Sequence, residues 1–501
     1  MLDYVARDYQ ATGIELCQRE KGVLLAYEPG SGKTVTAYTA ADLLMNDSFA
    51  VQKTLVVGPK LVAQEVWTRE VAKWRHLQHL RVRLLDAPIF DYYKKVTASF
   101  VGPGGPGEII LGAATPEERE ALFLADVVVT KSELLPRDWR ATKDRILKDP
   151  CQVHVVSRDH LFTLVMLLGR DWPYQLMIGD ESTSFKNHES KRTIAVRHLR
   201  QEGLLDRLIL MSGTPSPRGI ENLWTQMLLL DGGARLGSRI GAFRKTYMVP
   251  NQKDAKRIFN WRAKPGATEL VTEKIKDICQ AVRADVWRKT EPPRVVEHVV
   301  TLPPAAMDQY RVMAEECYLE IGDGEITASQ AAVLSNKLLQ MASGAVLDSD
   351  GNYHVIHDEK LDALEELLEE LDGEPLLLMY WYKSTLDRLR KRFGARLSTI
   401  KTKGFLDRFA AGKLPLLALQ PGSAGHGLDG LQDGGHHVAA LDLFHDWELF
   451  QQTVSRLDRS GQEHRVTVHL FLADQTKDAQ VGRVLADRGA DQGKVMDALR
   501  R

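Results

Sequence analysis

Short apolar runs recur along the chain, and most are followed by a turn and then by a stretch whose apolar residues have helical spacing. Such runs, rich in Val, Leu and Ile and bounded by turn residues, are typical of buried strands. In the first half they occupy residues 23–26, 54–58, 126–130, 153–156 and 208–211, and a further run opens the stretch Leu176–Thr183. Strands that alternate with helices predict βαβ units and a parallel sheet.

The second half repeats this alternation, with apolar runs at residues 376–381, 414–419, 438–443 and 466–472. The segment between the halves differs, because residues 301–320 and 328–343 have helical spacing. An amphipathic helix is expected over residues 360–371, with its leucines in the core. We therefore predict an α/β chain with parallel-sheet domains at residues 1–233 and 353–501, separated by a helical insertion at residues 234–352.

Basic residues accumulate in part of this insertion and are interleaved with Trp261 and Trp287. One interpretation is a protrusion that grips the backbone of duplex DNA. The alternative is a solvated helical module between the domains, because Glu269, Glu273 and Asp277 are interspersed. The basic residues concerned are Arg257, Arg262, Lys264, Lys274, Lys276, Arg283, Arg288 and Lys289.

Composition narrows the class of protein without identifying a partner. The 66 Lys and Arg residues balance 67 Asp and Glu residues, so any binding of nucleic acid must come from a local basic face. The cysteines form no C-x-x-C pair, which argues against a zinc site or a disulfide framework and fits a reducing compartment. No apolar run approaches the ~20 residues of a membrane span. We expect a cytoplasmic protein without a membrane partner.

A Pro- and Gly-rich turn follows the first apolar run and ends in Gly-Lys-Thr. Its glycines would let backbone N–H groups approach a polyphosphate. Lys33 would place a positive charge on the outer phosphates, and Thr34 would offer its hydroxyl to Mg²⁺. The alternative is a plain turn before a surface lysine, and Tyr27 stands where the full motif has glycine. The residues expected to hold ATP here are Pro29, Gly30, Ser31, Gly32, Lys33 and Thr34.

The segment upstream of this loop offers groups for an adenine base. Gln10 carries a paired donor and acceptor, Tyr9 could stack on the base, and Arg7 lies beside them. We therefore include Arg7 and Gln10 among the residues expected to bind the cofactor ATP. The alternative is an ordinary amphipathic helix.

Two adjacent acids end the run that begins at Leu176. Ligands of open α/β sheets bind at the carboxyl ends of the strands. Asp180 would hold Mg²⁺ there, and Glu181 would orient and polarise the attacking water. Two acids at a strand end are common in loops, but their place after a Gly-Lys-Thr loop favours the catalytic interpretation. Further on, the small residues at 212–215 fit a loop that senses the γ-phosphate, or a simple turn.

Arg456 and Arg459 lie three residues apart near the end of the second half, which would put them on one face of a helix. Arginines that reach across a cleft to the γ-phosphate neutralise charge that develops in the transition state. Such spacing is also common on surface helices. Nearby, His436 and His437 invite a metal interpretation, but adjacent residues of a strand point to opposite faces, so we expect a turn instead.

Four short motifs occur in the order found in superfamily-two helicases, namely Tyr9-Gln10, GSGKT at 30–34, DES at 180–182 and SGTP at 212–215. With NLWTQMLLLDG at 222–232 and FRKTY at 243–247, nearly the whole chain resembles the Swi/Snf-type branch, especially its short phage and bacterial members. Tyr27 and Asp8 depart from the residues usual in that family, and the acidic motif continues as DEST. None of these departures removes a residue that the chemistry needs.

The resemblance implies two RecA-like lobes in tandem with ATP and Mg²⁺ in the cleft between them. The first lobe would hold the phosphates, and the second would supply Arg456 and Arg459. Closure on ATP and opening after hydrolysis would move the lobes along a nucleic-acid backbone. Residues 421–429 resemble the fifth motif of the family, although Asp429 stands where relatives often have asparagine. Contacts with nucleic acid are expected at Pro59, Lys60, Lys186, Ser423 and Gly425.

The leading hypothesis is thus a DNA-stimulated ATPase that translocates on duplex DNA in a bacterial or phage-infected cytoplasm, with a replication or repair protein as a candidate partner. One alternative is a strand-separating helicase on DNA or RNA. An alternative of another class is a nucleotide-gated scaffold that binds DNA and hydrolyses ATP poorly, against which the intact Lys33, Glu181, Arg456 and Arg459 argue. The choice between DNA and RNA, the polarity of movement and the oligomeric state stay open.

Overall fold

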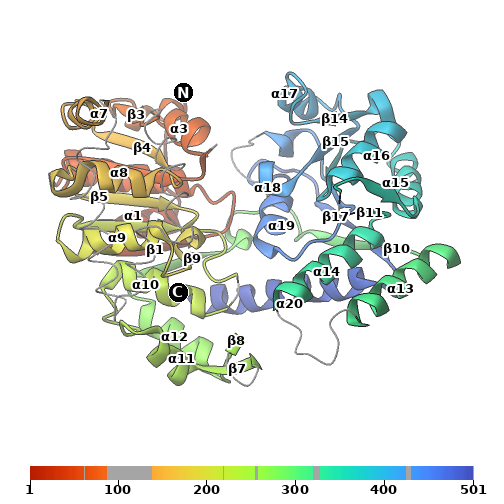
Figure 1. Cartoon of the computed structure of the whole chain (residues 1–501). Helices are drawn as coiled ribbons and strands as arrows, with labels where there is room; N and C mark the ends of the chain where they lie inside the picture. The colour runs from red at the N-terminus through yellow and green to blue at the C-terminus, as the bar shows by residue number, and fades with distance from the viewer. Residues whose placement is uncertain are drawn as a thin grey trace.

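The computed structural model describes residues 1–60, 62–86, 138–217, 219–253, 258–319, 328–348, 350–424 and 430–499. These residues form two α/β lobes that lie side by side, with the N-terminal lobe in red to yellow and the C-terminal lobe in blue (Figure 1). The strand predicted at residues 126–130 lies outside the described ranges. Within those ranges, no helix combines the length and the apolar character needed to cross a bilayer.

The described part of the first lobe is built on a seven-stranded parallel sheet with the order β3-β4-β2-β5-β6-β1-β9. Its central strands are apolar along their length because helices cover both faces of a parallel sheet. The predicted runs in the described ranges are confirmed as strands. Their bounds are β1 Gly22–Tyr27, β2 Thr54–Gly58, β3 Val82–Leu84, β4 Val153–Ser157, β5 Leu176–Asp180, β6 Arg207–Met211 and β9 Cys279–Val282.

Alternate side chains of β1 enter hydrophobic cores on opposite faces of this sheet. Val23 and Leu25 pack on the face covered by α1 and α2. Leu24 and Ala26 pack on the face covered by α8, α9 and α10. The helices of this lobe are α1 Asp8–Arg19, α2 Lys33–Asn46, the π-helix η1 Val62–Trp67, α3 Thr68–Lys73, α7 Asp138–Leu147, α8 Leu161–Leu168, α9 Lys191–Gln201 and α10 Glu221–Asp231.

The second lobe has a six-stranded parallel sheet, described in the order β10-β17-β16-β13-β15-β14. All four predicted strands of this half are present. Leu376 and Leu378 face α15 and α16, whereas Leu377 and Met379 face α17, α19 and α20. The bounds are β10 Arg294–Val300, β13 Leu376–Met379, β14 Leu397–Thr399, β15 Leu416–Leu419, β16 His437–Ala440, β17 Thr467–Ala473, α15 Glu359–Glu370, α16 Lys383–Phe393, α17 Phe405–Ala410, α18 Pro421–Ala424, α19 Trp447–Val454 and α20 Lys477–Leu499.

The range 234–352, predicted as a helical insertion, contributes to both sheets. Strand β9 pairs with β1 at the edge of the first sheet, and β10 pairs with β17 at the edge of the second. Both are short or partly charged edge strands, so no long apolar run marked them. The helices predicted at 301–320 and 328–343 are present. This range also contains α11 Ile240–Tyr247, β7 Met248–Lys253, β8 Ile258–Ala263, α12 Ala267–Ile275, α13 Pro304–Leu319, α14 Ala328–Ala342 and β11 Ala345–Leu347, and the adjoining β12 spans Tyr353–Val355.

The last helix, α20, returns from the second lobe to the first (Figure 1). Val481 and Leu485 near its start lie in the core of the second lobe. Met496 and Leu499 near its end lie in the core of the first. Asp497 accepts a hydrogen bond from Arg283 Nη1 at 2.7 Å. The lobes are therefore joined by α20 as well as by the segment between β9 and β10.

Candidate nucleotide-binding site

The first strand leads directly into the predicted phosphate loop. Strand β1 ends at Tyr27 and α2 begins at Lys33, as the sequence pattern predicts. Gly30 and Gly32 have φ angles of 86° and 79°, a conformation that glycine adopts without strain. The first N–H groups of α2 have no partner within the helix, and such groups bind phosphate well.

Lys33 stands at the mouth of this loop with acidic residues beside it. Its Nζ donates a hydrogen bond to the Tyr27 carbonyl at 2.7 Å. Burial lowers the pKa of Lys33, and the negative charges of Glu181 and Asp180 oppose that shift. The ammonium group can therefore exchange one oxygen partner, the carbonyl, for another on a bound phosphate.

Tyr27, the departure from the usual glycine, is accommodated within the lobe. Its hydroxyl lies 2.5 Å from Gln280 Oε1 and 3.1 Å from the Tyr9 carbonyl. A Cβ atom on Gly13 would lie 2.1 Å from that hydroxyl, so the glycine of α1 makes room for the tyrosine. Only the Tyr27 carbonyl, through its bond to Lys33, takes part in the loop.

Two of the residues considered for adenine, Tyr9 and Gln10, contact the phosphate loop. Gln10 Nε2 and the Tyr9 hydroxyl both donate to the Ser31 carbonyl, at 3.2 and 2.9 Å. Gln10 Oε1 accepts from the Arg7 backbone N–H at 3.0 Å. Both ends of the Gln10 amide are thus used by the protein, and Arg7 itself is exposed. Contact of Arg7 and Gln10 with a base stays a prediction.

The two acids at the end of β5 are held in different ways. Asp180 Oδ2 accepts from the Trp67 indole at 2.8 Å, and Oδ1 accepts from the Glu181 N–H at 3.0 Å. Burial raises the pKa of Asp180. Burial, and then the neighbouring Asp180 charge, raises the pKa of Glu181 to about 7. Glu181 also has a φ of 52°, a conformation uncommon for residues other than glycine and often found at functional sites.

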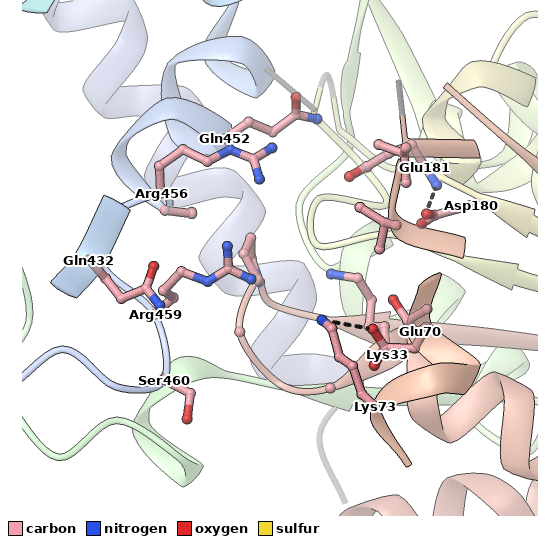
Figure 2. Close-up of a pocket in the computed structure, with 17 residues that line it drawn as sticks. Lys33, Glu70, Lys73, Asp180, Glu181, Gln432, Gln452, Arg456, Arg459 and Ser460 are labelled. Atoms are coloured by element: carbon pink, nitrogen blue, oxygen red, sulfur yellow. Dashed lines mark hydrogen bonds and ion pairs between the residues drawn. The ribbon is translucent and has the colours of Figure 1, made fainter. Parts of the chain in front are cut away.

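The second lobe brings its arginines to the same place. Figure 2 shows the Arg456 and Arg459 side chains extending from that lobe towards Lys33 and Glu181 of the first. The prediction of a helix through both residues is wrong. Helix α19 ends at Val454, and the arginines lie in the turns that follow it. Gly461, with a φ of 101°, lies just after both arginines, and a helix cannot continue through it.

A cavity of about 380 Å³ opens between these groups. It brings together the loop of the first lobe, the acidic pair and both arginines, which are far apart in the sequence. The acidic Glu70 and the basic Lys73 of α3 also line this cavity (Figure 2). The predicted residues that line it are Pro29, Gly30, Gly32, Lys33, Thr34, Asp180, Glu181, Arg456 and Arg459.

The donor set of this cavity fits Mg²⁺. The Thr34 hydroxyl and the Asp180 carboxylate both line it, and hard oxygen ligands are those that Mg²⁺ prefers. The ion would also offset the unfavourable burial of two adjacent carboxyl groups. The residues that would hold it are therefore Thr34 and Asp180, together with phosphate oxygens of the nucleotide.

Two groups of contacts that the sequence did not predict lie around this cavity and connect the second lobe to the rest of the chain. Arg288 donates to both carboxylate oxygens of Asp458, at 2.9 and 2.5 Å. Glu448 of α19 accepts from the Thr183 hydroxyl and forms an ion pair with Lys186 at 3.3 Å. Asp458 lies between the two arginines in the sequence, which could have drawn attention to it. No sequence signal marked Glu448.

Residues 212–215 pack against the phosphate loop. A Cβ atom on Gly213 would lie 2.8 Å from Pro29 Cδ. The Ser182 hydroxyl donates to Gln226 Oε1 at 2.6 Å, and Gln226 Nε2 donates to the Pro215 carbonyl at 2.7 Å. The acidic motif is thus connected to this loop through the buried Gln226, a link that the sequence did not indicate.

Three of the residues expected to contact nucleic acid, namely Pro59, Lys60 and Lys186, lie outside the cavity lining. Pro59 is buried and Lys60 is exposed at the carboxyl end of β2. Lys186 pairs with Glu448, Ser423 belongs to α18, and Gly425 lies outside the described residues. No contact of these residues tests that expectation.

Several members of the predicted basic cluster have structural partners instead. Arg283 pairs with Asp497, and Arg288 pairs with Asp458. Trp287 packs against the phosphate loop, since a Cβ atom on Gly30 would lie 2.9 Å from its Cη2. These contacts do not decide between a protrusion that grips DNA and a solvated helical module, so both interpretations stay open. Arg257 lies outside the described residues.

A phosphate loop, an acidic pair and arginines from a second parallel-sheet lobe define a two-lobe nucleotide-binding protein. The family model of the SNF2-related domain matches residues 9–343. The chain belongs to this family, and the resemblance to Swi/Snf-type proteins is confirmed.

Other known proteins are similar over nearly the whole chain. Putative protein p41 of Acyrthosiphon pisum secondary endosymbiont phage 1 is 30% identical over 482 residues, which cover 94% of each chain. The SWI2/SNF2 ATPase core of Sulfolobus solfataricus in complex with dsDNA is 16% identical, with a TM-score of 0.40 over 99% of this chain and 93% of that one. The Sulfolobus solfataricus SWI2/SNF2 ATPase core domain gives the same identity and TM-score, over 97% of this chain and 88% of that one.

Proposed function

We propose that the protein is a DNA-stimulated ATPase that hydrolyses ATP between its lobes and translocates on duplex DNA. The observation that carries the proposal is the single cavity in which Lys33, Asp180, Glu181, Arg456 and Arg459 meet. Each of these groups has a place in phosphoryl transfer, and the arrangement draws them from both lobes. The choice of duplex DNA rests on membership of the SNF2-related family.

The chain's own groups would act in a defined order. Lys33 would leave the Tyr27 carbonyl for the outer phosphates, and the α2 N-terminus would hold the remaining oxygens. Arg456 and Arg459 would approach the γ-phosphate as the lobes close, and neutralise the charge that develops there. Glu181 would orient the attacking water and accept its proton. Bound Mg²⁺ would supply charge neutralisation on the β- and γ-phosphate oxygens.

The raised pKa of Glu181 would let lobe closure change the protonation state of this carboxyl group. With a pKa of about 7, the carboxyl is partly protonated near neutral pH in the nucleotide-free protein. The positive charge of Arg456 lowers that pKa, so closer approach of the second lobe favours the ionised form that accepts a proton. Lobe closure would therefore activate the base as well as position the arginines.

The test is the rate of ATP hydrolysis with duplex DNA, single-stranded DNA, duplex RNA and single-stranded RNA. We expect duplex DNA to stimulate hydrolysis most, and Lys33→Ala to abolish the stimulated rate while the chain stays folded. Displacement of a triplex-forming strand, without separation of the duplex, would show translocation. Slow hydrolysis that no nucleic acid stimulates would support the scaffold alternative, and strand separation would support the helicase alternative.

A further inference from the structure

The second lobe carries a cluster of histidines on β10, β16 and β17 and just before β16 and β17, outside the lining of the nucleotide cavity. Strands β10, β16 and β17 lie side by side there, and each supplies one histidine. Glu374, just before β13, reaches the same place. The residues concerned are His298, His436, His437, His464, His469 and Glu374.

Two imidazoles converge on one carboxylate oxygen. His437 Nε2 lies 3.2 Å and His436 Nε2 lies 3.5 Å from Glu374 Oε2. All three ligand atoms lie within 4.8 Å of one another. A tetrahedral ion with bonds of about 2.1 Å places neighbouring ligand atoms roughly 3.4 Å apart, close to both of these separations. A turn is expected from the sequence at His436 and His437, and His436 does lie outside β16, which begins at His437, so the argument from opposite faces of a strand does not apply to this pair.

A chain of imidazoles, of which His469 is buried, supports His437 from behind. His437 Nδ1 lies 3.0 Å from His469 Nε2, and His469 Nδ1 lies 2.9 Å from His298 Nε2. Histidines that bind metals use the second ring nitrogen in such a bond, which orients the first towards the ion.

We propose that Glu374, His436 and His437 bind a divalent transition-metal ion such as Zn²⁺. Two imidazole nitrogens and one carboxylate oxygen suit Zn²⁺, Co²⁺ or Ni²⁺ better than Mg²⁺ or Ca²⁺. The fourth position is open to water or to His464, whose ring centroid lies 4.9 Å from that of His436. The Glu374 side chain is 55% exposed, which gives an ion a route to the site.

The ion would tie the segment before β13 to the start of β16. These strands are neighbours, with Leu376 paired to His437. None of Glu374, His436 and His437 lines the nucleotide cavity, so the site is expected to stabilise the second lobe without entering the ATPase reaction. This separation gives the two proposals independent tests.

The experiment is a competition between the full-length, untagged, metal-depleted protein and a chromophoric Zn²⁺ chelator, without nucleotide. We expect one Zn²⁺ per chain, and a loss of affinity of at least about tenfold in Glu374→Gln and in His437→Gln. Zn²⁺ should also raise the unfolding temperature of the parent protein and not that of the variants. Magnesium-dependent ATP hydrolysis by Glu374→Gln should equal that of the parent.

His354→Gln is the matched control, because His354 forms an exposed pair with Asp348 at 2.9 Å and has no place in the cluster. This variant should bind Zn²⁺ like the parent. Far-ultraviolet circular dichroism checks that each variant is folded, and the half-exposed Glu374 tolerates an isosteric change even if His437 does not. Failure of the parent to bind Zn²⁺, or equal affinity in Glu374→Gln, would overturn the proposal and leave the cluster as a hydrogen-bond network.

Discussion

Trp67 donates its indole N–H to Asp180 Oδ2 at 2.8 Å. The tryptophan ends the π-helix η1 in one part of the first lobe, and the aspartate ends β5 in another. Both side chains are buried, so this bond fixes the direction in which the carboxylate presents its remaining lone pairs. The candidate Mg²⁺ ligand is therefore oriented by a residue that the sequence marks only as apolar.

Replacing Trp67 by Phe should weaken the response to Mg²⁺. The change leaves a buried carboxylate oxygen without its donor, which costs roughly 1–3 kcal/mol of stability. Loss of an orienting partner typically reduces metal affinity about 10- to 100-fold. The Mg²⁺ concentration for half-maximal ATP hydrolysis should rise accordingly, and a Mg²⁺ titration of the rate measures it.

Tyr38→Phe is the control for that experiment. The Tyr38 hydroxyl donates to the Trp67 carbonyl at 2.6 Å, so its removal disturbs the same buried region without touching the indole N–H. We expect a similar loss of stability and an unchanged Mg²⁺ requirement. Equal Mg²⁺ requirements in both variants would show that the indole does not orient Asp180.

The stability of the nucleotide-free protein should depend on pH through Glu181. Its pKa in the folded protein, about 7, lies above the ordinary value of 4.5. A carboxyl group with a raised pKa stabilises the folded protein most at low pH, where it is protonated. This contribution to the free energy of unfolding is lost as the pH rises through about 7. Glu181→Gln should therefore become more stable relative to the parent by roughly 2–3 kcal/mol between acid and mildly alkaline pH.

Urea unfolding of both proteins over that pH range measures the difference. Glu269→Gln, at an exposed position of α12, is the control and should show no such trend. A constant difference between Glu181→Gln and the parent at every pH would contradict the burial-driven shift.

Variants of the catalytic residues should separate nucleotide binding from hydrolysis. Glu181→Gln leaves Asp180 free to hold Mg²⁺, so the protein should bind ATP, close and hydrolyse it slowly. Arg456→Ala or Arg459→Ala removes a charge supplied across the cavity, which should lower hydrolysis by roughly 10³ or more and impair closure. A fluorescence distance probe across the lobes distinguishes the two outcomes. Normal hydrolysis and closure in Arg459→Ala would contradict the two-lobe mechanism.

The Arg288–Asp458 pair should hold the arginines in place. Both side chains are largely buried, at 13% and 9% exposure, and removing one partner of a buried pair costs about 3–5 kcal/mol. Arg288→Ala should reduce stability and, because Asp458 adjoins Arg459, the rate of hydrolysis. In Arg288→Ala/Asp458→Asn the unpaired charge is gone, so stability should partly recover while the rate stays low.

Arg235→Ala is the matched control for the Arg288 variant. Arg235 forms a pair of the same length with Asp277, at 2.5 Å and more exposed, within the first lobe, remote in sequence from both arginines of the cavity. Its loss should leave the rate of hydrolysis unchanged. The ATPase rate and the midpoint of urea unfolding are measured for each variant. A normal ATPase rate in Arg288→Ala would show that the pair does not position Arg459.

The sequence by itself determined the α/β class and the phosphate loop. Buried parallel strands must be apolar, and a loop that wraps a phosphate needs glycines such as Gly30 and Gly32, so both leave local signals. The acidic pair was found for a similar reason, because it follows a strand directly. These features depend on neighbours in the chain, which a sequence displays.

Only the tertiary structure decided which distant residues meet. Trp67 on Asp180, Arg288 on Asp458 and Glu448 on Lys186 join residues whose pairing depends on how whole elements pack. The same holds for β9 and β10, which are strands because a sheet edge is available to them, and for His437, whose neighbours come from adjacent strands. A local sequence pattern does not indicate such packing, because the same residue types occur in hydrophobic cores, on surfaces and in functional sites.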